Sequence, residues 1–190
     1  MNPWDKLLIP EIVVTTGLFV LSAFLAYFFL SGFIWGAGFQ PTPKKDIELA
    51  AELLALKEGM LVYDLGSGTG DVIMHLARNY KVKCIGIEID PLKVLLSKIR
   101  ISRAKDLRTL IEIKRTNFLS VDLSKADAIY VFLSGGTNIM KNLEPKLLSE
   151  LKHDAKIASY VHSFQNWTPE ISLRDIRVYS ISEVKAKSLI

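Results

Sequence analysis

A glycine-rich turn constrains the fold of this 190-residue chain more than any other feature of its sequence. A short apolar run ends in Asp64, glycines follow at Gly66, Gly68 and Gly70, and a helical pattern begins at Asp71. This order predicts a strand, a tight turn and a helix N-terminus. Glycines let a ligand approach bare backbone, and the N–H groups at the start of a helix favour a carboxylate or phosphate. We therefore expect a ligand site at this turn.

The spacing of the glycines narrows the kind of ligand. In the dinucleotide fingerprint G-x-G-x-x-G, the third glycine would fall on Asp71. The pattern is instead G-x-G-x-G, and with its preceding acid it resembles motif I of the class I S-adenosylmethionine (SAM) methyltransferases. The resemblance implies a Rossmann-like fold in which the turn binds SAM, with Asp64 near the amino acid end of the cofactor. The residues expected to bind the cofactor here are Asp64, Gly66, Ser67, Gly68 and Gly70.

Two later strand ends complete the predicted adenosyl site. Glu88 ends the next apolar run, about 18 residues after the last glycine, where a carboxylate can accept hydrogen bonds from ribose hydroxyls. Asn117 and Phe118 follow the third predicted strand, where an amide can pair with the adenine edge and a ring can cover its face. Each residue alone has an ordinary structural explanation. Their order on successive strands favours SAM over NAD or another nucleotide.

Strands and helices alternate along residues 46–190, which predicts right-handed βαβ units and a doubly wound, mostly parallel α/β sheet. Ligands of such sheets bind at the carboxyl ends of the strands. We expect a helix interrupted or restarted at Pro145, and a short final strand over residues 185–190. The helices are expected at 46–56, 71–79, 91–103 and 138–151, and the strands at 60–64, 82–87, 110–114, 128–133, 157–162 and 176–181.

Residues 12–35 contain no charged side chain, and they predict a single transmembrane helix. About 24 residues at roughly 1.5 Å each span roughly 36 Å, enough to cross a hydrocarbon core. A cleaved signal peptide is the main alternative, but residues 1–11 lack a basic start. Residues 36–45 form a linker rich in glycine and proline. Lys44 and Lys45 follow the helix, so we expect the domain to face the cytoplasm, or an organelle interior that contains SAM.

The net charge and the cysteine content give weaker indications of partners and compartment. The net charge is +4, and the basic residues at 93–108 are best interpreted as a solvated helix face rather than a nucleic-acid site; lipid headgroup contact is the alternative. The single cysteine, Cys84, falls in a predicted buried strand. It offers no disulfide and no metal site, which fits a reducing compartment.

The methyl acceptor is expected beside the segment that follows the fourth strand. The Asn/Asp-Pro-Pro-aromatic motif of enzymes acting on planar amides or nucleobase amines is absent there, and no catalytic base is evident. A lysine amine needs deprotonation and alignment, so proximity can supply most of the catalysis. Trp167 has two interpretations, an indole that holds an ammonium by cation–π contact or a side chain that packs a loop. The residues expected near the acceptor are Phe132, Leu133, Tyr160 and Trp167.

A closer resemblance covers residues 41–170. The segments that carry it are Pro41-Thr42-Pro43, Tyr63–Gly66, Gly86–Ile89, Asn117-Phe118, Leu143–Leu147 and Phe164–Pro169. They resemble a protein-lysine methyltransferase family with archaeal members and mitochondrial members that act on the c-ring protein of ATP synthase and the adenine nucleotide translocase. The family usually has Gly-Asp-Gly-Arg where this chain has Gly68-Thr69-Gly70-Asp71, so the chain departs from the family pattern by lacking that arginine.

The sequence therefore predicts a membrane-anchored, SAM-dependent methyltransferase whose acceptor is a protein lysine. The partners expected are a membrane-associated protein substrate and the bilayer, which residues 12–35 would cross, with no nucleic acid. Two alternatives stay open. One is a methyltransferase acting on a membrane lipid or quinone, and the other is a protein that binds SAM without catalysis.

Overall fold

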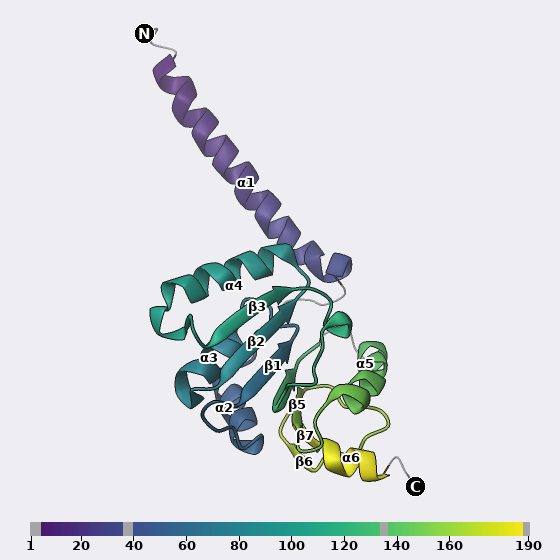
Figure 1. Cartoon of the computed structure of the whole chain (residues 1–190). Helices are drawn as coiled ribbons and strands as arrows, with labels where there is room; N and C mark the ends of the chain where they lie inside the picture. The colour runs from purple at the N-terminus through teal and green to yellow at the C-terminus, as the bar shows by residue number, and fades with distance from the viewer. Residues whose placement is uncertain (1–4, 36–39, 134–136, 188–190) are drawn as a thin grey trace. The chain divides into compact units, whose positions relative to one another are not determined.

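The computed structural model describes residues 5–35, 40–133 and 137–187, which divide into two compact units, residues 1–39 and 40–190. The first unit contains the helix α1 (Asp5–Trp35), shown in purple in Figure 1. Its segment Pro10–Tyr27 has a mean hydropathy of 1.6, and none of it is buried. The helix is thus long and apolar enough to cross a membrane, as the sequence predicts, on grounds of length and composition alone.

The second unit is built on one seven-stranded sheet in the order β3-β2-β1-β4-β5-β7-β6 (Figure 1). The five strands from β3 to β5 in this order are parallel, and β7 pairs antiparallel with both β5 and β6. Asp64 on β1 lies between Gly86 on β2 and Tyr130 on β4 in the register. The strands are β1 (Leu61–Leu65), β2 (Lys83–Glu88), β3 (Ile111–Arg115), β4 (Ala128–Val131), β5 (Lys156–Tyr160), β6 (Ile171–Leu173) and β7 (Ile176–Ser180).

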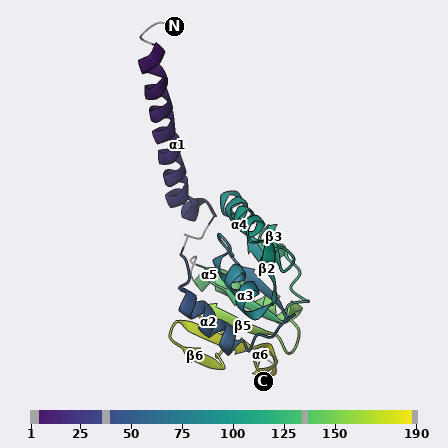
Figure 2. The same cartoon turned by 90° about the vertical axis from the view of Figure 1, so that its left-hand side faces the viewer.

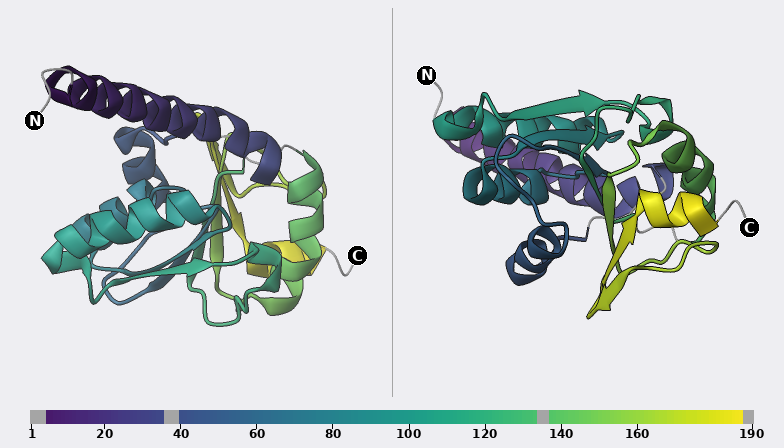
Figure 3. Two further views of the ribbon diagram at one scale, coloured as in Figure 1. Left: turned by 90° about the horizontal axis from the view of Figure 1, so that it is seen from above. Right: turned by 60° about the horizontal axis from the view of Figure 1, so that its bottom comes forward.

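Helices cover both faces of this sheet. One face carries α2 (Lys44–Leu53), α3 (Asp71–Tyr80) and α4 (Pro91–Arg103), and Figure 2 views it with α2 and α3 in front of the strands. The other face carries α5 (Thr137–Glu150) and α6 (Ile181–Lys187). In the left view of Figure 3, the teal α4 and the green α5 lie on opposite sides of the strands. Two 3₁₀ turns, η1 (Lys105–Leu107) and η2 (Phe118–Ser120), flank β3.

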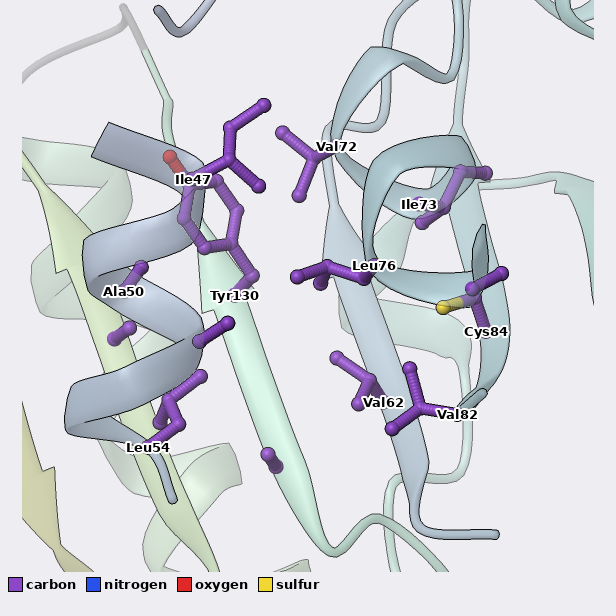
Figure 4. Close-up of a cluster of buried hydrophobic side chains, with 14 of the residues drawn as sticks. Ile47, Ala50, Leu54, Val62, Val72, Ile73, Leu76, Val82, Cys84 and Tyr130 are labelled. Atoms are coloured by element: carbon purple, nitrogen blue, oxygen red, sulfur yellow. The ribbon is translucent and has the colours of Figure 1, made fainter. Parts of the chain in front are cut away.

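The alternation of side chains along each strand divides the core into two buried layers. Figure 4 shows the layer beneath α2 and α3, where Ile47 and Leu76 pack against Val62 and Tyr130 of the sheet. Cys84 lies in this layer, and burial raises the pKa of its thiol to about 12. The thiol therefore stays protonated and packs as a small apolar group.

The structure confirms the Rossmann-like α/β class, and apart from shifts at the ends of elements it differs from the sequence prediction in three places. Helix α5 runs through Pro145 without a break, because the buried Leu143 and Leu147 hold both sides of the proline against the core. Residues 185–187, expected in a final strand, belong to the helix α6, because Ile181 and Val184 are spaced to bury one helical face. The rest of that expected strand, residues 188–190, lies outside the described residues. The three-residue strand β6 was not predicted, since it is short and mostly exposed.

Candidate functional site

The glycine turn follows the carboxyl end of β1 and lies beside the last residues of the neighbouring strand β2. The backbone N–H groups of Gly66 and Ser67 both donate to the Ile87 carbonyl oxygen, at 2.9 and 3.0 Å. Gly66, Gly68 and Gly70 all have positive φ, at 88°, 53° and 83°. Side chains rarely adopt this conformation, so the turn requires glycine at every second position, as the sequence predicts.

Neighbouring chain segments press closely on the turn. A Cβ on Gly66 would lie 2.8 Å from Leu133 Cδ2, and a Cβ on Gly86 would lie 2.7 Å from Ser67 Oγ. Real Cβ atoms do not approach so closely, so a side chain at either position would force Leu133 or Ser67 to shift. Gly86 was not singled out from the sequence, although a glycine inside a buried strand is a signal of close backbone approach.

Glu88 ends β2 and closes the turn. Its Oε2 accepts a hydrogen bond from the Gly68 N–H at 2.8 Å, and its Oε1 accepts from the Ile89 and Asp90 N–H groups at 2.8 and 2.9 Å. A carboxylate has about four acceptor positions, so these bonds leave capacity for one further donor. Glu88 is therefore placed at the turn, as the ribose assignment requires, and it also fixes the shape of the turn.

Asp64 and Ser67 supply buried polar atoms without hydrogen-bond partners. Asp64 is 3% exposed, and neither its Oδ2 nor the Ser67 Oγ has a partner among the described residues. Burial, and then the charges of Glu88 and Asp71, raise the pKa of Asp64 to about 8. A buried acceptor that is short of a donor fits the ammonium group of SAM, which would supply both a hydrogen bond and a positive charge.

The residues around the turn therefore fit the cofactor that the sequence predicts. Asp64 would hold the ammonium end, and Glu88 would accept from the ribose. The N–H groups of Gly66, Ser67, Gly68 and Gly70 already donate within the chain, to Ile87, Glu88 and Ser67. Asn117 follows β3, where its Oδ1 accepts from the Leu119 N–H at 2.9 Å, and Phe118 is half-buried beside it. Both keep the positions expected for the adenine contacts, which stay predictions.

Arg100 reaches the glycine turn from α4. Its Nη1 donates to the Thr69 carbonyl oxygen at 2.7 Å, and its Nη2 donates to Asp71 Oδ1 at 2.6 Å. The Thr69 hydroxyl donates to the other Asp71 oxygen at 2.8 Å. Burial would raise the pKa of Asp71, but the bonds from Arg100 and Thr69 and the Arg100 charge outweigh it, so this pKa lies below its ordinary value.

The predicted solvated face of α4 is therefore only partly correct. Arg100 binds the turn, and Lys93 is buried with its Nζ 3.6 Å from Asp90 Oδ2. Lys98 and Arg103 are exposed, as expected.

Two of the predicted acceptor residues lie together at the ends of β4 and β5. The rings of Phe132 and Tyr160 meet edge to face with centroids 4.9 Å apart. Leu133 is buried against Gly66, which joins this segment directly to the glycine turn. Tyr130, two residues before Phe132 on β4, bonds the Thr42 hydroxyl at 3.1 Å through its own hydroxyl.

Trp167 lies in the other buried layer. It is 8% exposed and packs against Phe164 and Tyr179, with ring centroids 4.5 and 6.0 Å away. Tyr160 belongs to the opposite layer, beneath α2. The position of Trp167 matches the packing interpretation, and no contact among the described residues brings it to Tyr160 or Phe132.

Glu144 explains why two of the segments that carry the resemblance occur together. Its Oε1 accepts from the Gln165 and Asn166 N–H groups at 2.7 and 3.3 Å, and its Oε2 accepts from Asn166 Nδ2 at 2.7 Å. The buried carboxylate of α5 thereby holds the loop that precedes Trp167. These segments build the fold around the site rather than the site itself.

Asp46 is a further candidate that was not singled out from the sequence. It lies in the first turn of α2, which begins at Lys44 and whose N-cap residue Pro43 makes no side-chain bond. Asp46 is buried, and its Oδ2 accepts from the Tyr160 hydroxyl at 3.1 Å. Metal-ligand groups of three or more His, Cys, Asp or Glu side chains do not occur in the part of the chain that the structure describes.

Comparison with known sequences places this site in a defined family. The family model of the ANTKMT methyltransferase domain matches residues 64–171. A protein-lysine N-methyltransferase of Saccharolobus islandicus is 31% identical over 131 residues, which cover 68% of this chain and 80% of that protein. The human lysine N-methyltransferase of the ATP synthase c-ring protein is 30% identical over 132 residues, covering 70% of this chain and 54% of that protein.

Solved structures show the same fold. An RNA methyltransferase from Salinibacter ruber, in complex with S-adenosyl-L-homocysteine, superposes with a TM-score of 0.70 at 26% identity, covering 76% of this chain and 95% of that one. The cyclopropane synthase MmaA2 from Mycobacterium tuberculosis superposes with a TM-score of 0.55 at 17% identity, covering 61% of this chain and 41% of that one.

Proposed function

The chain belongs to the ANTKMT methyltransferase domain family, which uses S-adenosyl-L-methionine, and from this premise we propose that it is a membrane-anchored enzyme that methylates a lysine amine on a protein. The observation that carries the acceptor class is the similarity of residues 64–171 to a family whose relatives include protein-lysine N-methyltransferases. The chain spans about half the length of the human relative, so the substrate of the whole protein is part of this proposal.

The reaction asks little of the protein beyond binding and alignment. Bound SAM supplies a methyl group on a positively charged sulfonium. The lone pair of a neutral lysine Nζ forms the new N–C bond while the C–S bond breaks and its electron pair stays on sulfur. The positive charge passes to the methylated amine. The lysine must therefore lose a proton to solvent before attack.

Residues of this chain meet these requirements at the carboxyl edge of the sheet. The glycine turn and Glu88 hold the donor, and Phe132 and Tyr160 line the position where the acceptor would enter. Aromatic rings exclude water and attract a cation at their faces. Alignment of this kind supplies much of the rate where the acceptor is itself a good nucleophile.

Membrane anchoring is the second part of the proposal. The side chains at residues 10–26 of α1 are exposed and almost entirely apolar, and such a surface needs an apolar environment. Lys44 and Lys45 follow the helix on the side of the catalytic unit, which supports a cytoplasmic domain, or one facing an organelle interior that contains SAM. The acceptor would then lie in or near the bilayer.

The test incubates the full-length protein, held in lipid nanodiscs, with methyl-labelled SAM and membrane fractions from its source. We expect label in protein that acid hydrolysis releases as methyl-lysine. Label found only in extracted lipid, quinone or RNA would overturn the lysine assignment. Tight SAM binding with no transfer to any fraction would instead indicate a non-catalytic protein. Recovery of the chain in the soluble fraction without detergent would overturn the anchoring.

A further inference from the structure

A buried carboxylate lies beside the expected acceptor position, and the reaction described so far does not use it. Asp46, in the first turn of α2, is 7% exposed. Its Oδ2 accepts from the Tyr160 hydroxyl at 3.1 Å, and its Oδ1 lies 3.5 Å from Arg174 Nη1. The three residues come from α2, the end of β5 and the turn between β6 and β7. Segments far apart in the sequence thus meet at one charged group.

This cluster continues from the glycine turn along the carboxyl edge of the sheet. Strand β4 lies between β1 and β5, and Phe132 follows it and packs edge to face on Tyr160. The turn residue Gly66 lies against Leu133, with the Phe132 carbonyl oxygen 3.6 Å from the position of a Gly66 Cβ. The cofactor turn and the Asp46 cluster are therefore joined by two consecutive residues.

A second polar group in the same layer is short of a partner. The buried Asp64 Oδ2 has no hydrogen-bond partner among the described residues. The charges of Asp64 and Asp46 both act on Tyr130, which lies between them, and burial with these charges raises the pKa of its hydroxyl. The layer beneath α2 therefore presents two carboxyl groups and three aromatic rings, a combination that favours a cation.

Arg174 satisfies Asp46 in a way that another cation could replace. Its side chain is 58% exposed, and its contact with Asp46 is a single long one, so the pair is held weakly. The Tyr160 bond is different, because burial and the Asp46 charge raise the pKa of Tyr160 to about 12, and the hydroxyl remains a donor. Tyr160 therefore orients the carboxylate, while Arg174 only neutralises it.

We propose that Asp46 and Tyr160 bind the ammonium group of the acceptor lysine, and that Arg174 occupies the same carboxylate until the acceptor displaces it. This inference rests on the proposed function, and it adds the residues that select a cationic acceptor. An ammonium group would gain a buried carboxylate partner and the aromatic face of Phe132. A lipid hydroxyl and a quinone are uncharged, so neither would gain from these two contacts. The proton leaves for solvent before the methyl group is transferred.

The test measures the acceptor KM and the SAM dissociation constant of the full-length protein, with the membrane fraction that accepts label as the acceptor. Asp46→Asn should raise the acceptor KM about 10-fold or more and leave SAM affinity within about 2-fold, because it removes one charge partner. Tyr160→Phe should raise the acceptor KM about 3-fold, because it removes the hydroxyl that orients Asp46 while the aromatic ring stays. Arg174→Ala should lower KM about 2-fold, because the competing cation is gone.

Glu48→Gln is the matched control, since Glu48 is an exposed acid on the same helix that pairs with His75. It should leave KM unchanged. n-Butylammonium should inhibit the unsubstituted enzyme competitively against the acceptor. Its inhibition constant should be at least about 5-fold higher for Asp46→Asn. If lysine is labelled but Asp46→Asn and Arg174→Ala both leave KM and this inhibition unchanged, the inference is wrong and the proposed function stands. If no lysine is labelled, the proposed function fails first.

Thermal unfolding identifies a variant that fails to fold. If Asp46→Asn fails to fold, Tyr160→Phe and Arg174→Ala still test the proposal, because KM should rise in the first variant and fall in the second. A purely structural role for the cluster would raise KM or lower activity in both.

Discussion

The Arg100 guanidinium on α4 binds the Asp71 carboxylate at 2.6 Å and the Thr69 carbonyl at 2.7 Å, so one side chain holds two residues of the glycine turn. The guanidinium reaches the turn from a different element, because Arg100 lies on α4 and the turn joins β1 to α3. Because α3 begins at Asp71, the clamp fixes both the turn and the first turn of α3 against α4.

Removing this clamp should weaken cofactor binding more than it weakens the fold. Arg100→Ala and Asp71→Asn should each raise the SAM dissociation constant about 3–10-fold, since the turn loses its tie to α4. Both side chains are about two-fifths exposed, so their coupling in a double-mutant cycle should be only about 0.5–1 kcal/mol. Calorimetric titration and thermal unfolding measure the two effects.

Arg103→Ala is the control for this pair, because Arg103 is exposed on the same helix. SAM affinity should not change in this variant. Equal losses in Arg100→Ala and Arg103→Ala would show that the general charge of α4, and not the clamp, supports cofactor binding.

Glu88→Ala should affect the apo domain as well as the complex. The carboxylate accepts three backbone N–H bonds, and its removal leaves those donors without their partner. We expect a loss of about 2 kcal/mol in the free energy of unfolding and a rise of more than about 10-fold in the SAM dissociation constant. Urea unfolding and calorimetry measure them, with the exposed Glu112→Gln on β3 as control. Unchanged SAM affinity would refute the ribose assignment.

Glu144→Ala should destabilise the fold without a direct effect on SAM. It removes the acceptor of three hydrogen bonds that hold the loop before Trp167. A buried group that loses a charged partner costs about 2–3 kcal/mol, so the urea midpoint should fall clearly. Lys141→Gln, at an exposed position of α5, is the control and should change nothing. A large loss of SAM affinity at temperatures where the variant is folded would contradict a purely structural role.

The parts of the site that the sequence predicted are those whose requirements are local. The glycines and Glu88 lie at strand ends that hydrophobic runs define, so spacing alone brings them together. Arg100 was interpreted as solvated because its partner Asp71 lies 29 positions earlier. The pattern of charged residues along one helix does not indicate a contact with another element. Asp46 was not identified as a site residue for the same reason, since its partner Tyr160 lies 114 positions away.

Trp167 had two interpretations from the sequence, an acceptor role and the packing of a loop. Its ring packs with Phe164 and Tyr179, as the packing interpretation expects. Which face of the sheet a loop aromatic meets depends on the path of the loop. That path is set by Glu144 on a different element, which no local pattern in the sequence reveals.

Asp64→Asn should change how stability depends on pH. Burial and the charges of Glu88 and Asp71 raise the pKa of Asp64 from 3.8 in the unfolded chain to about 8 in the apo domain. Between these values the native state keeps a proton that the unfolded state has released. Stability from this group therefore falls as pH rises from about 4 to about 8 and is lowest above pH 8.

Asparagine cannot ionise, so the free energy of unfolding of the variant does not fall with pH through this group. The variant should therefore become more stable relative to the unsubstituted protein as pH rises from 5 to 9. A difference on the order of a few kcal/mol corresponds to about 2–4 °C in Tm per kcal/mol for a domain of this size. Asp122→Asn is the control, because hydrogen bonds from Ser124 lower the pKa of Asp122 and its effect on stability should be constant over this range. Thermal unfolding across pH 5–9 without SAM measures both. Parallel curves for Asp64→Asn and the unsubstituted protein would mean that Asp64 is ionised at neutral pH before the cofactor binds.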